Sequence, residues 1–360
     1  MKTRAELMTI SEIKEEPCGA AEESTIEQFL LQCTSCGVCR TSCSFLDAHG
    51  SPDEIISLSK RDLFLCTNCG ACKPACPSGL DPAEALLLAK QLLIETGQVP
   101  EQAAKALGSA GRFVQWGASF PFAHYSRAET VFWPGCSLAG MAPDVVLKVQ
   151  QLLAEERGKA VGITLDCCAD PVYEMGDLKA ARKRAEAIGK SLDQQGTRTV
   201  IAGCANCIKV LRRYLPDLDV KHVLEVLPGK AAASLLPDSI YLHHPCPSYR
   251  FEALQGSARR LCGDRKIAEQ GRPQCCGQGG GLPALSPGSA EACTRDVFNA
   301  AANLPLVTYC MGCKDQFLRQ GKQAYHLLEL LVSVPPVERP VSSVRKWLNR
   351  LVLALRARWR

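Results

Sequence analysis

The sequence predicts an α/β protein with a helical N-terminal domain, two related halves built on parallel strands, and a C-terminal amphipathic helix. Three observations support this order. Apolar residues recur with helical spacing around two cysteine runs before residue 97, and Val- and Ile-rich runs alternate with helical stretches from 130 to 332. Helical spacing returns after residue 343. At 360 residues the chain is too long for one compact core, so several domains are expected.

Composition limits where the protein works and what it binds. Residues 1–23 are polar and acidic and lack the apolar stretch of a secretory signal, and no apolar run reaches the length of a membrane span. We therefore expect a cytoplasmic protein, or one peripheral on the inner face of the cell membrane, with reduced cysteines. The formal net charge is +5, but seven basic and no acidic residues lie in 339–360, so the rest carries −2. This excludes a basic body that binds nucleic acid.

The N-terminal domain, expected over residues 25–120 after a polar segment 1–24, carries two cysteine runs with the spacing C-x2-C-x2-C-x3-C. This spacing is typical of bacterial 4Fe-4S sites, in which three close thiolates bind one cubane cluster and the fourth cysteine binds the other. The expected cofactor-binding sets are Cys33, Cys36, Cys39 with Cys76, and Cys66, Cys69, Cys72 with Cys43. Zinc is the alternative, but zinc sites usually pair two Cys-x-x-Cys hooks. The second run continues into Pro77, as the bacterial pattern does, whereas the first continues into Ser44.

Helices are expected on both sides of these runs. The expected helices span 25–32, 52–62 and 81–96. Asp81 and Pro82 form a typical helix start, with a capping side chain followed by proline in the first turn. The pattern favours a helical ferredoxin domain over the βαβ kind. Residues 97–130 carry scattered glycine, proline and aromatic residues and are expected to connect this domain to the next.

An internal repeat fills residues 130–232 and 233–332. Four motifs recur in the same order, at offsets that fall from 110 to 104 residues. The motif pairs are Trp133 to Cys136 with His243 to Cys246, Cys167-Cys168 with Cys275-Cys276, Cys204-x-x-Cys207 with Cys310-x-x-Cys313, and His222 to Glu225 with His326 to Glu329. Apolar runs stop at the cysteines, and helical stretches such as 142–153 and 208–214 follow. Because ligands of parallel sheets lie at the carboxyl ends of the strands, ten cysteines are expected to converge as two groups of five.

These motifs resemble the CCG domain, the cysteine-rich domain of heterodisulfide reductase catalytic subunits. The domain also occurs in iron-sulfur subunits of glycolate oxidase, lactate-utilisation proteins and anaerobic glycerol-3-phosphate dehydrogenase. With the ferredoxin domain in front, the resemblance covers roughly residues 25–332. It implies two Rossmann-like CCG repeats, each binding a noncubane 4Fe-4S cluster through five cysteines where disulfide cleavage takes place; some relatives hold zinc at one of the two sites.

Carried over to this chain, the resemblance names two complete metal-binding sets. The first CCG set is Cys136, Cys167, Cys168, Cys204 and Cys207, and the second CCG set is Cys246, Cys275, Cys276, Cys310 and Cys313. The first set departs from the family pattern, because Ala169 stands where the family has glycine, and a methyl group there would crowd a cluster. The second set keeps its glycine, Gly277, and is therefore the one expected to be catalytic.

Several residues stay outside these sets. Cys18, Cys262 and Cys293 are expected to be buried as small apolar side chains. His243 and His244 are expected to be structural; the alternative is a hydrogen bond to a sulfur or a proton relay. The remaining histidines of the repeat, His222 and His326, are expected to be positions of the fold. The glycines at 277, 279, 280 and 281 match no phosphate loop and are expected to pack around the cysteines. No serine nucleophile motif, paired carboxylates or nucleotide fingerprint is found.

The last segment, 333–360, is expected to be a proline-bearing linker followed by a basic amphipathic helix. Its apolar face consists of Val344, Trp347, Leu348, Leu351, Val352, Leu355 and Trp359, and its cations are Arg345, Lys346, Arg350, Arg356, Arg358 and Arg360. Such a helix is typical of contact with an anionic membrane surface, here through residues 344–360. Docking on the protein's own body or on an acidic partner subunit is the equally weighted alternative.

Together these features predict an iron-sulfur electron-transfer and catalytic subunit of a heterodisulfide reductase-like oxidoreductase. Two cubanes would pass electrons to CCG-bound clusters that reduce a disulfide or a quinone-linked acceptor. Because no flavin or nicotinamide motif is visible, flavin-containing or other redox partner subunits are expected. The alternative is a non-catalytic iron-sulfur relay that anchors a flavin dehydrogenase of the glycolate, lactate or glycerol-3-phosphate type to the membrane.

Overall fold

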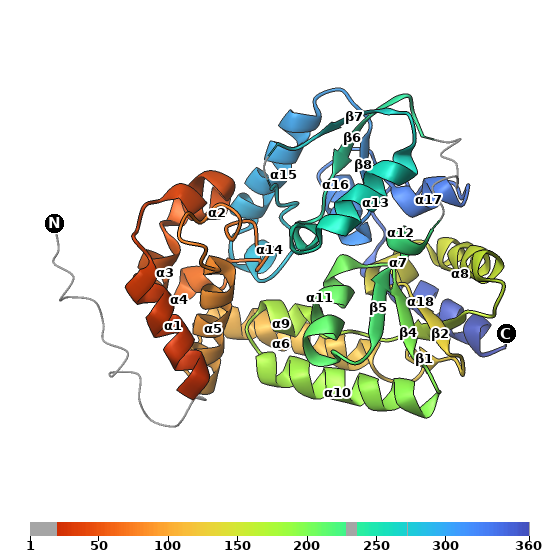
Figure 1. Cartoon of the computed structure of the whole chain (residues 1–360), viewed down its shortest axis with the longest axis horizontal. Helices are drawn as coiled ribbons and strands as arrows, with labels where there is room; N and C mark the ends of the chain where they lie inside the picture. The colour runs from red at the N-terminus through yellow and green to blue at the C-terminus, as the bar shows by residue number, and fades with distance from the viewer. Residues whose placement is uncertain (1–19, 228–235, 272, 360) are drawn as a thin grey trace.

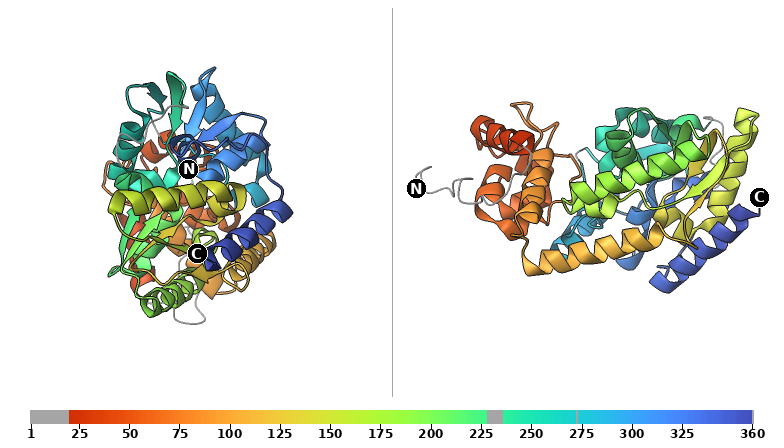
Figure 2. Two further views of the ribbon diagram at one scale, coloured as in Figure 1. Left: turned by 90° about the vertical axis from the view of Figure 1, so that its right-hand side faces the viewer. Right: turned by 90° about the horizontal axis from the view of Figure 1, so that it is seen from below.

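The computed structural model describes residues 20–227, 236–271 and 273–359, so Cys18 lies outside the described residues. The molecule is elongated, with the N-terminal helices at one end and the C-terminal helix at the other (Figures 1 and 2). Two α/β halves lie between them. Their sheets are largely parallel, so the predicted fold class is confirmed.

The N-terminal part is helical around the cysteine runs. Its elements are α1 (Ala20–Gln32), η3 (Val38–Ser42), α2 (Ser44–His49), α3 (Pro52–Leu58), α4 (Lys60–Leu63), α5 (Pro82–Glu95) and α6 (Glu101–Gly117). The predicted start of α5 is confirmed, because the Asp81 side chain accepts the Glu84 N–H at 3.2 Å and Pro82 occupies the first turn. The helix expected over 52–62 is divided at Ser59, whose hydroxyl caps α4.

Helix α6 was not expected, because 97–130 were predicted to be a connection. Gly108 and Gly111 lie inside it, and an interior glycine costs a helix about 1 kcal/mol. Tertiary packing offsets that cost: α6 lies against α9 and α14 and buries Ala103 and Val114. The interior glycines hid this helix, although Ala103, Leu107, Ala110 and Val114 recur with helical spacing.

The first half contains a five-stranded sheet. Its elements are β1 (His124–Tyr125), β2 (Thr130–Trp133), α7 (Cys136–Met141), α8 (Pro143–Arg157), β3 (Gly162–Leu165), α9 (Asp170–Glu174), α10 (Leu178–Gln194), β4 (Thr199–Ala202), α11 (Ala205–Tyr214), β5 (Asp219–His222) and α12 (Val223–Val226). The strand order is β1-β3-β2-β4-β5, with β1 antiparallel at the edge and the others parallel. Val131 lies opposite Val200 in the central pair.

The second half repeats this topology. Its elements are β6 (Ser239–His243), η4 (Cys246–Arg250), α13 (Glu252–Cys262), β7 (Lys266–Glu269), α14 (Leu282–Leu285), α15 (Pro287–Ala301), β8 (Leu306–Thr308), α16 (Met311–Arg319), β9 (Ala324–His326) and α17 (Leu327–Leu331). The parallel order β7-β6-β8-β9 matches β3-β2-β4-β5 strand by strand. The internal repeat predicted from the motifs is therefore present as repeated topology.

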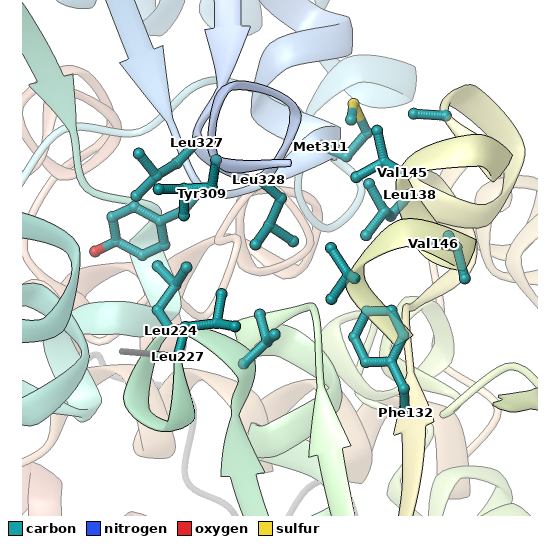
Figure 3. Packing of buried hydrophobic residues seen from close by; sticks show 14 of the residues in the cluster. Phe132, Leu138, Val145, Val146, Leu224, Leu227, Tyr309, Met311, Leu327 and Leu328 are labelled. Carbon is teal, nitrogen blue, oxygen red and sulfur yellow. The ribbon is translucent and has the colours of Figure 1, made fainter. Parts of the chain in front are cut away.

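One hydrophobic core joins the two halves (Figure 3). From the first half it takes Phe132, Val145 and Leu224, and from the second half Tyr309 and Leu328. A second core joins the N-terminal helices to both halves through α9, α14 and α15. The three parts are thus packed against one another, which places the cysteine sets described below close together.

Helix α18 (Ser343–Arg358) packs on α7 and α8 rather than standing free. Leu353, Ala354 and Ala357 are buried in the core shared by the halves, and the Trp347 ring lies 4.7 Å from that of Phe122. The predicted single apolar face is thus divided. Its exposed members are Val344, Leu348, Val352, Leu355 and Trp359. Within the described ranges, none of the helices is both long enough and apolar enough to cross a bilayer.

Candidate functional site

The first N-terminal cavity is lined by the four cysteines predicted to share a cluster. These are Cys33, Cys36, Cys39 and Cys76, called here the first ferredoxin-type site. Positive φ angles at Ser35 (52°) and Gly37 (73°) fold the chain back between the first three thiols. Cys76 comes from the other run, so the geometry contains the predicted crossing of the fourth cysteine. Cys36 is exposed, which puts this site at the surface of the molecule.

The second N-terminal cavity is lined by the other predicted set, Cys43, Cys66, Cys69 and Cys72, called here the second ferredoxin-type site. The Asn68 N–H donates to Cys66 Sγ at 3.4 Å, and the Ala71 N–H donates to Cys69 Sγ at 3.5 Å. Such N–H···S bonds stabilise negative charge on a cluster and help to set its reduction potential. Three further cysteines line the same cavity: Cys246, Cys275 and Cys293. The sequence had not placed these three beside the ferredoxin-type cysteines.

The CCG cysteines lie where the predicted parallel strands end. Cys136 follows β2, Cys204 follows β4, Cys246 follows β6 and Cys310 follows β8; each lies at the start of a helix or at its N-cap. Every CCG cysteine except Cys275 lines one cavity of about 770 Å³ between the halves. The two sets therefore share a single chamber, and Cys246 lines both that chamber and the second ferredoxin-type site.

The thiols make the same contacts in both halves. In the first CCG set, thiol–thiol interactions that shift the cysteine pKa values join Cys136 with Cys167, Cys168 with Cys207, and Cys204 with Cys207. In the second CCG set, such interactions join Cys246 with Cys275, Cys276 with Cys313, and Cys310 with Cys313. The two halves thus present one repeated arrangement of five sulfurs.

The donor set fits iron-sulfur clusters. Among the residues that the structure describes, no three Cys, His, Asp or Glu side chains surround one point, as a mononuclear metal ion requires. A 4Fe-4S cluster needs another arrangement, because its thiolates would be distributed over several irons rather than gathered around one ion. Trp133 and His243 occupy the same place in the two repeats, and both are fully buried with ring nitrogens that have no hydrogen-bond partner in the structure. Sulfide or thiolate sulfur at the CCG sets would supply acceptors for such N–H groups.

Ala169 has a left-handed backbone, with φ +70°, and so does its counterpart Gly277, with φ +84°. Glycine adopts this conformation at no steric cost, which is the physical reason for the family pattern. Around Gly277 the space is also closed, because an added Cβ would lie 2.3 Å from the backbone oxygen of Ala290. Ala169 is accommodated, with its side chain fully buried.

Gly277→Ala should therefore lower stability by several kcal/mol, because the new methyl collides with backbone that cannot move away cheaply. The reverse change at the equivalent position, Ala169→Gly, should alter it by less than about 1 kcal/mol. Relief of a left-handed strain of about 1–2 kcal/mol is opposed by the loss of a buried methyl worth about 0.8 kcal/mol. Thermal unfolding of the two variants and the wild type under anaerobic conditions measures both changes in stability. Equal effects of the two changes would contradict this account.

The repeated histidines act in the fold, as predicted. His222 and His326 begin α12 and α17, and each ring accepts a backbone N–H at 3.2 Å while Glu225 or Glu329 completes the capping box. His244 bridges Tyr309 at 2.8 Å and Glu269 at 2.6 Å, which also supports a structural role.

A buried charged cluster beside the chamber was missed. Asp170 and Glu174 lie one turn apart on α9, and both line the chamber. Lys209 Nζ is 2.8 Å from Asp170 and 3.1 Å from Glu174, while the Gly280 N–H donates to Glu174 at 2.8 Å. Burial, followed by the neighbouring Glu174 carboxylate, raises the pKa of Asp170 to about 7. The sequence analysis found no paired carboxylates, although the i, i+4 spacing of this pair after Cys167-Cys168 was a usable signal.

The same cluster explains the glycine run. Lys90 Nζ donates to the backbone oxygens of Cys66 at 2.6 Å and Glu174 at 2.8 Å. A Cβ at Gly280 would lie 3.1 Å from the Cys66 oxygen. Close packing around the cysteines is thus confirmed for Gly280, whereas Gly277, Gly279 and Gly281 pack closely on other residues.

Arg350 of α18 is a further residue that sequence reasoning misplaced, because it was counted among cations facing a membrane. It is 5% exposed, stacks over the Trp347 ring at 4.3 Å and lines a small cavity with Cys136 and Asp166. A hydrogen bond with Cys167 and, to a smaller extent, the positive charge of Arg350 lower the pKa of Cys136 to about 7, against the effect of burial. The C-terminal helix therefore contributes charge to the first CCG set.

Two sheets of matching strand order, each carrying five cysteines at its carboxyl edge, agree with an iron-sulfur protein that contains two CCG domains. The model of this cysteine-rich domain matches residues 130–212 and 240–317, so the chain contains two CCG domains. The chain is similar to one of the subunits of fumarate reductase (CoM/CoB) from Methanothermobacter marburgensis, an oxidoreductase, with 26% identity over 353 residues. It is also similar to an uncharacterized iron-sulfur protein of Methanococcus maripaludis, with 22% identity over 307 residues.

These similarities cover most of this chain but only part of the relatives. The first covers 89% of this chain and 65% of the relative, and the second covers 81% and 58%. The chain thus spans less than two thirds of the length of these curated relatives. Their identity as a reductase subunit and as an iron-sulfur protein agrees with the class that the cysteine sets define.

Proposed function

We propose that this chain is the iron-sulfur electron-transfer and catalytic subunit of a heterodisulfide reductase-like oxidoreductase. The observation that carries the proposal is the shared chamber, since every CCG cysteine except Cys275 lines one cavity of about 770 Å³. Cavities of this size accept small organic ligands. The relationship to a fumarate reductase (CoM/CoB) subunit supports a thiol or disulfide as the reacting group, with a quinone-linked acceptor as the second possibility.

The cofactors follow from the sets. One 4Fe-4S cubane would be held at each ferredoxin-type site, and a noncubane 4Fe-4S cluster at one or both CCG sets, with zinc as the alternative at one of them. When bound, these groups supply one-electron transfer and reduction of the acceptor in the chamber. Flavin-containing or other redox partner subunits would deliver the electrons.

The chain's own residues arrange these sites in an order. The first ferredoxin-type site lies at the surface through Cys36, and the second is buried against Cys246 and Cys275. Cys246 lines both that site and the chamber. This order supports transfer from a surface partner towards the second CCG set.

The test is electron paramagnetic resonance of anaerobically purified protein with and without a thiol or disulfide. We expect about sixteen irons per chain, from two cubane and two noncubane clusters, and a new signal when the ligand is added. About eight irons with one or two zincs, and no ligand-dependent signal, would contradict the catalytic role and would support a chain that only transfers electrons.

The second candidate function is a non-catalytic relay that anchors a flavin dehydrogenase, in the cytoplasm or on the inner face of the cell membrane. The exposed part of α18 favours it, because Val344 and Trp359 are 71% and 88% exposed. The exposed Phe120 ring, beside Arg358, adds to this surface. Such a surface is suited to lipid or to a partner subunit. In this case, adding a thiol or a disulfide would not change the electron paramagnetic resonance signals.

A further inference from the structure

Two features that the proposed function leaves unused meet in the structure. Ser44 stands where the second cysteine run has Pro77, and Cys293 belongs to none of the four cysteine sets. Although 249 positions separate them, Ser44 Oγ lies 3.4 Å from Cys293 Sγ. Cys293 is 4% exposed and lines the second ferredoxin-type site. Burial alone, as expected for this cysteine, does not account for a hydrogen-bonded pair in that position.

Cys293 also lies beside the second CCG set, because Cys293 and Cys275 line the same cavity and their thiols interact. The next residue on α15 holds the other member of the Cys275-Cys276 pair: Thr294 Oγ1 donates to the Cys276 backbone oxygen at 2.8 Å. Gly277 N–H adds a donor to Cys275 Sγ at 3.3 Å. Donors thus gather around the Cys275 sulfur.

The first half has a different residue at this position of the repeat. The helices align through buried residues of the same spacing, which are Ala181, Ala185, Ile188 and Leu192 in α10 and Ala290, Thr294, Val297 and Ala301 in α15. This alignment puts Arg184 at the place of Cys293, and Arg184 pairs with Asp166 and carries no thiol. The Ser44–Cys293 pair is therefore not repeated at α10.

We propose that Ser44 and Cys293 form a hydrogen-bond relay, from the Ser44 hydroxyl to the Cys293 sulfur and from the Cys293 thiol to the Cys275 sulfur, that raises the reduction potential of the centre bound through Cys275. A donor to a ligand sulfur stabilises the more negative, reduced form of a cluster. Ser44 directly follows Cys43, a predicted ligand of the second ferredoxin-type site. The relay therefore spans the step between the two centres. Both residues are positioning residues, and the inference rests on the clusters of the proposed function.

The experiment compares midpoint potentials of the full-length protein in redox titrations followed by electron paramagnetic resonance. Cys293→Ala removes the donor and Cys293→Ser keeps one. We expect Cys293→Ala to make the midpoint potential of one centre more negative by about 59 mV. For a one-electron reduction this is a tenfold change in the equilibrium constant. Serine should restore most of the difference, and Ser44→Ala should shift the same centre by a smaller amount.

Cys262→Ala is the matched control, because Cys262 is also a fully buried cysteine outside every set but packs in the core shared by the halves. It should leave all potentials unchanged. Unchanged potentials in Cys293→Ala, or a shift that serine does not reverse, would overturn the relay. Loss of iron in Cys293→Ser would overturn it too, since Cys293 would then be a ligand. Wild-type iron content is measured first, so failure of the proposed function itself is recognised separately.

Discussion

Cys276→Ser should abolish disulfide or quinone reduction while both ferredoxin-type sites keep their iron. Cys276 is 5% exposed, contacts Cys313 and lines the chamber, and serine oxygen is a poor ligand for a soft metal site. Turnover with a reduced dye as electron donor measures the loss. Resonance spectra of the same sample show whether the cubane signals persist.

Two companion changes make this result specific. Cys262→Ser, remote from all four sets, should retain wild-type turnover and controls for the loss of any buried thiol. Cys69→Ser should slow electron delivery, because Cys69 is a proposed ligand of the second ferredoxin-type site and lines the same cavity as Cys246. Wild-type turnover in Cys276→Ser would mean that the second CCG set is not the catalytic one.

Leu353→Ala should destabilise the protein by about 2–5 kcal/mol, the usual cost of deleting a fully buried leucine side chain. Leu353 is completely buried in the core that joins the two halves, although it belongs to the last helix of the chain. Chemical denaturation under anaerobic conditions provides the measurement.

Leu355→Ala is the matched control for Leu353→Ala, since the same substitution two residues later removes a side chain that is 44% exposed. It should change stability by no more than about 0.5 kcal/mol. If α18 binds lipid or a partner through its exposed face, Leu355→Ala should weaken that binding instead. Similar stabilities for the two variants would show that α18 does not dock on the body in solution.

Local spacing made much of the site predictable. The cysteine runs and the offsets of the repeat depend on neighbours along the chain, so they predicted four groups of thiols and two sheets. The structure brings each predicted ferredoxin-type set into one cavity, and most CCG cysteines into another. Strand ends were predictable because parallel strands deliver their carboxyl ends to one edge.

What the sequence could not predict depends on contacts between distant parts. Helix α6 contains interior glycines and packs against α9 and α14. Arg350 is buried because its guanidinium stacks on Trp347 and lines a cavity with Cys136 of the first CCG set. Asp170 and Glu174 form a buried charged cluster only because both pair with Lys209, which lies on another helix. Periodicity carries no information about such pairings.

The core shared by the halves has a consequence for how the chain unfolds. Leu224 of α12 and its repeat counterpart Leu328 of α17 both lie in this core, so each half supplies part of one continuous apolar interior (Figure 3). A single repeat would leave this apolar face open to water. The two repeats are therefore expected to lose their structure together rather than one after the other.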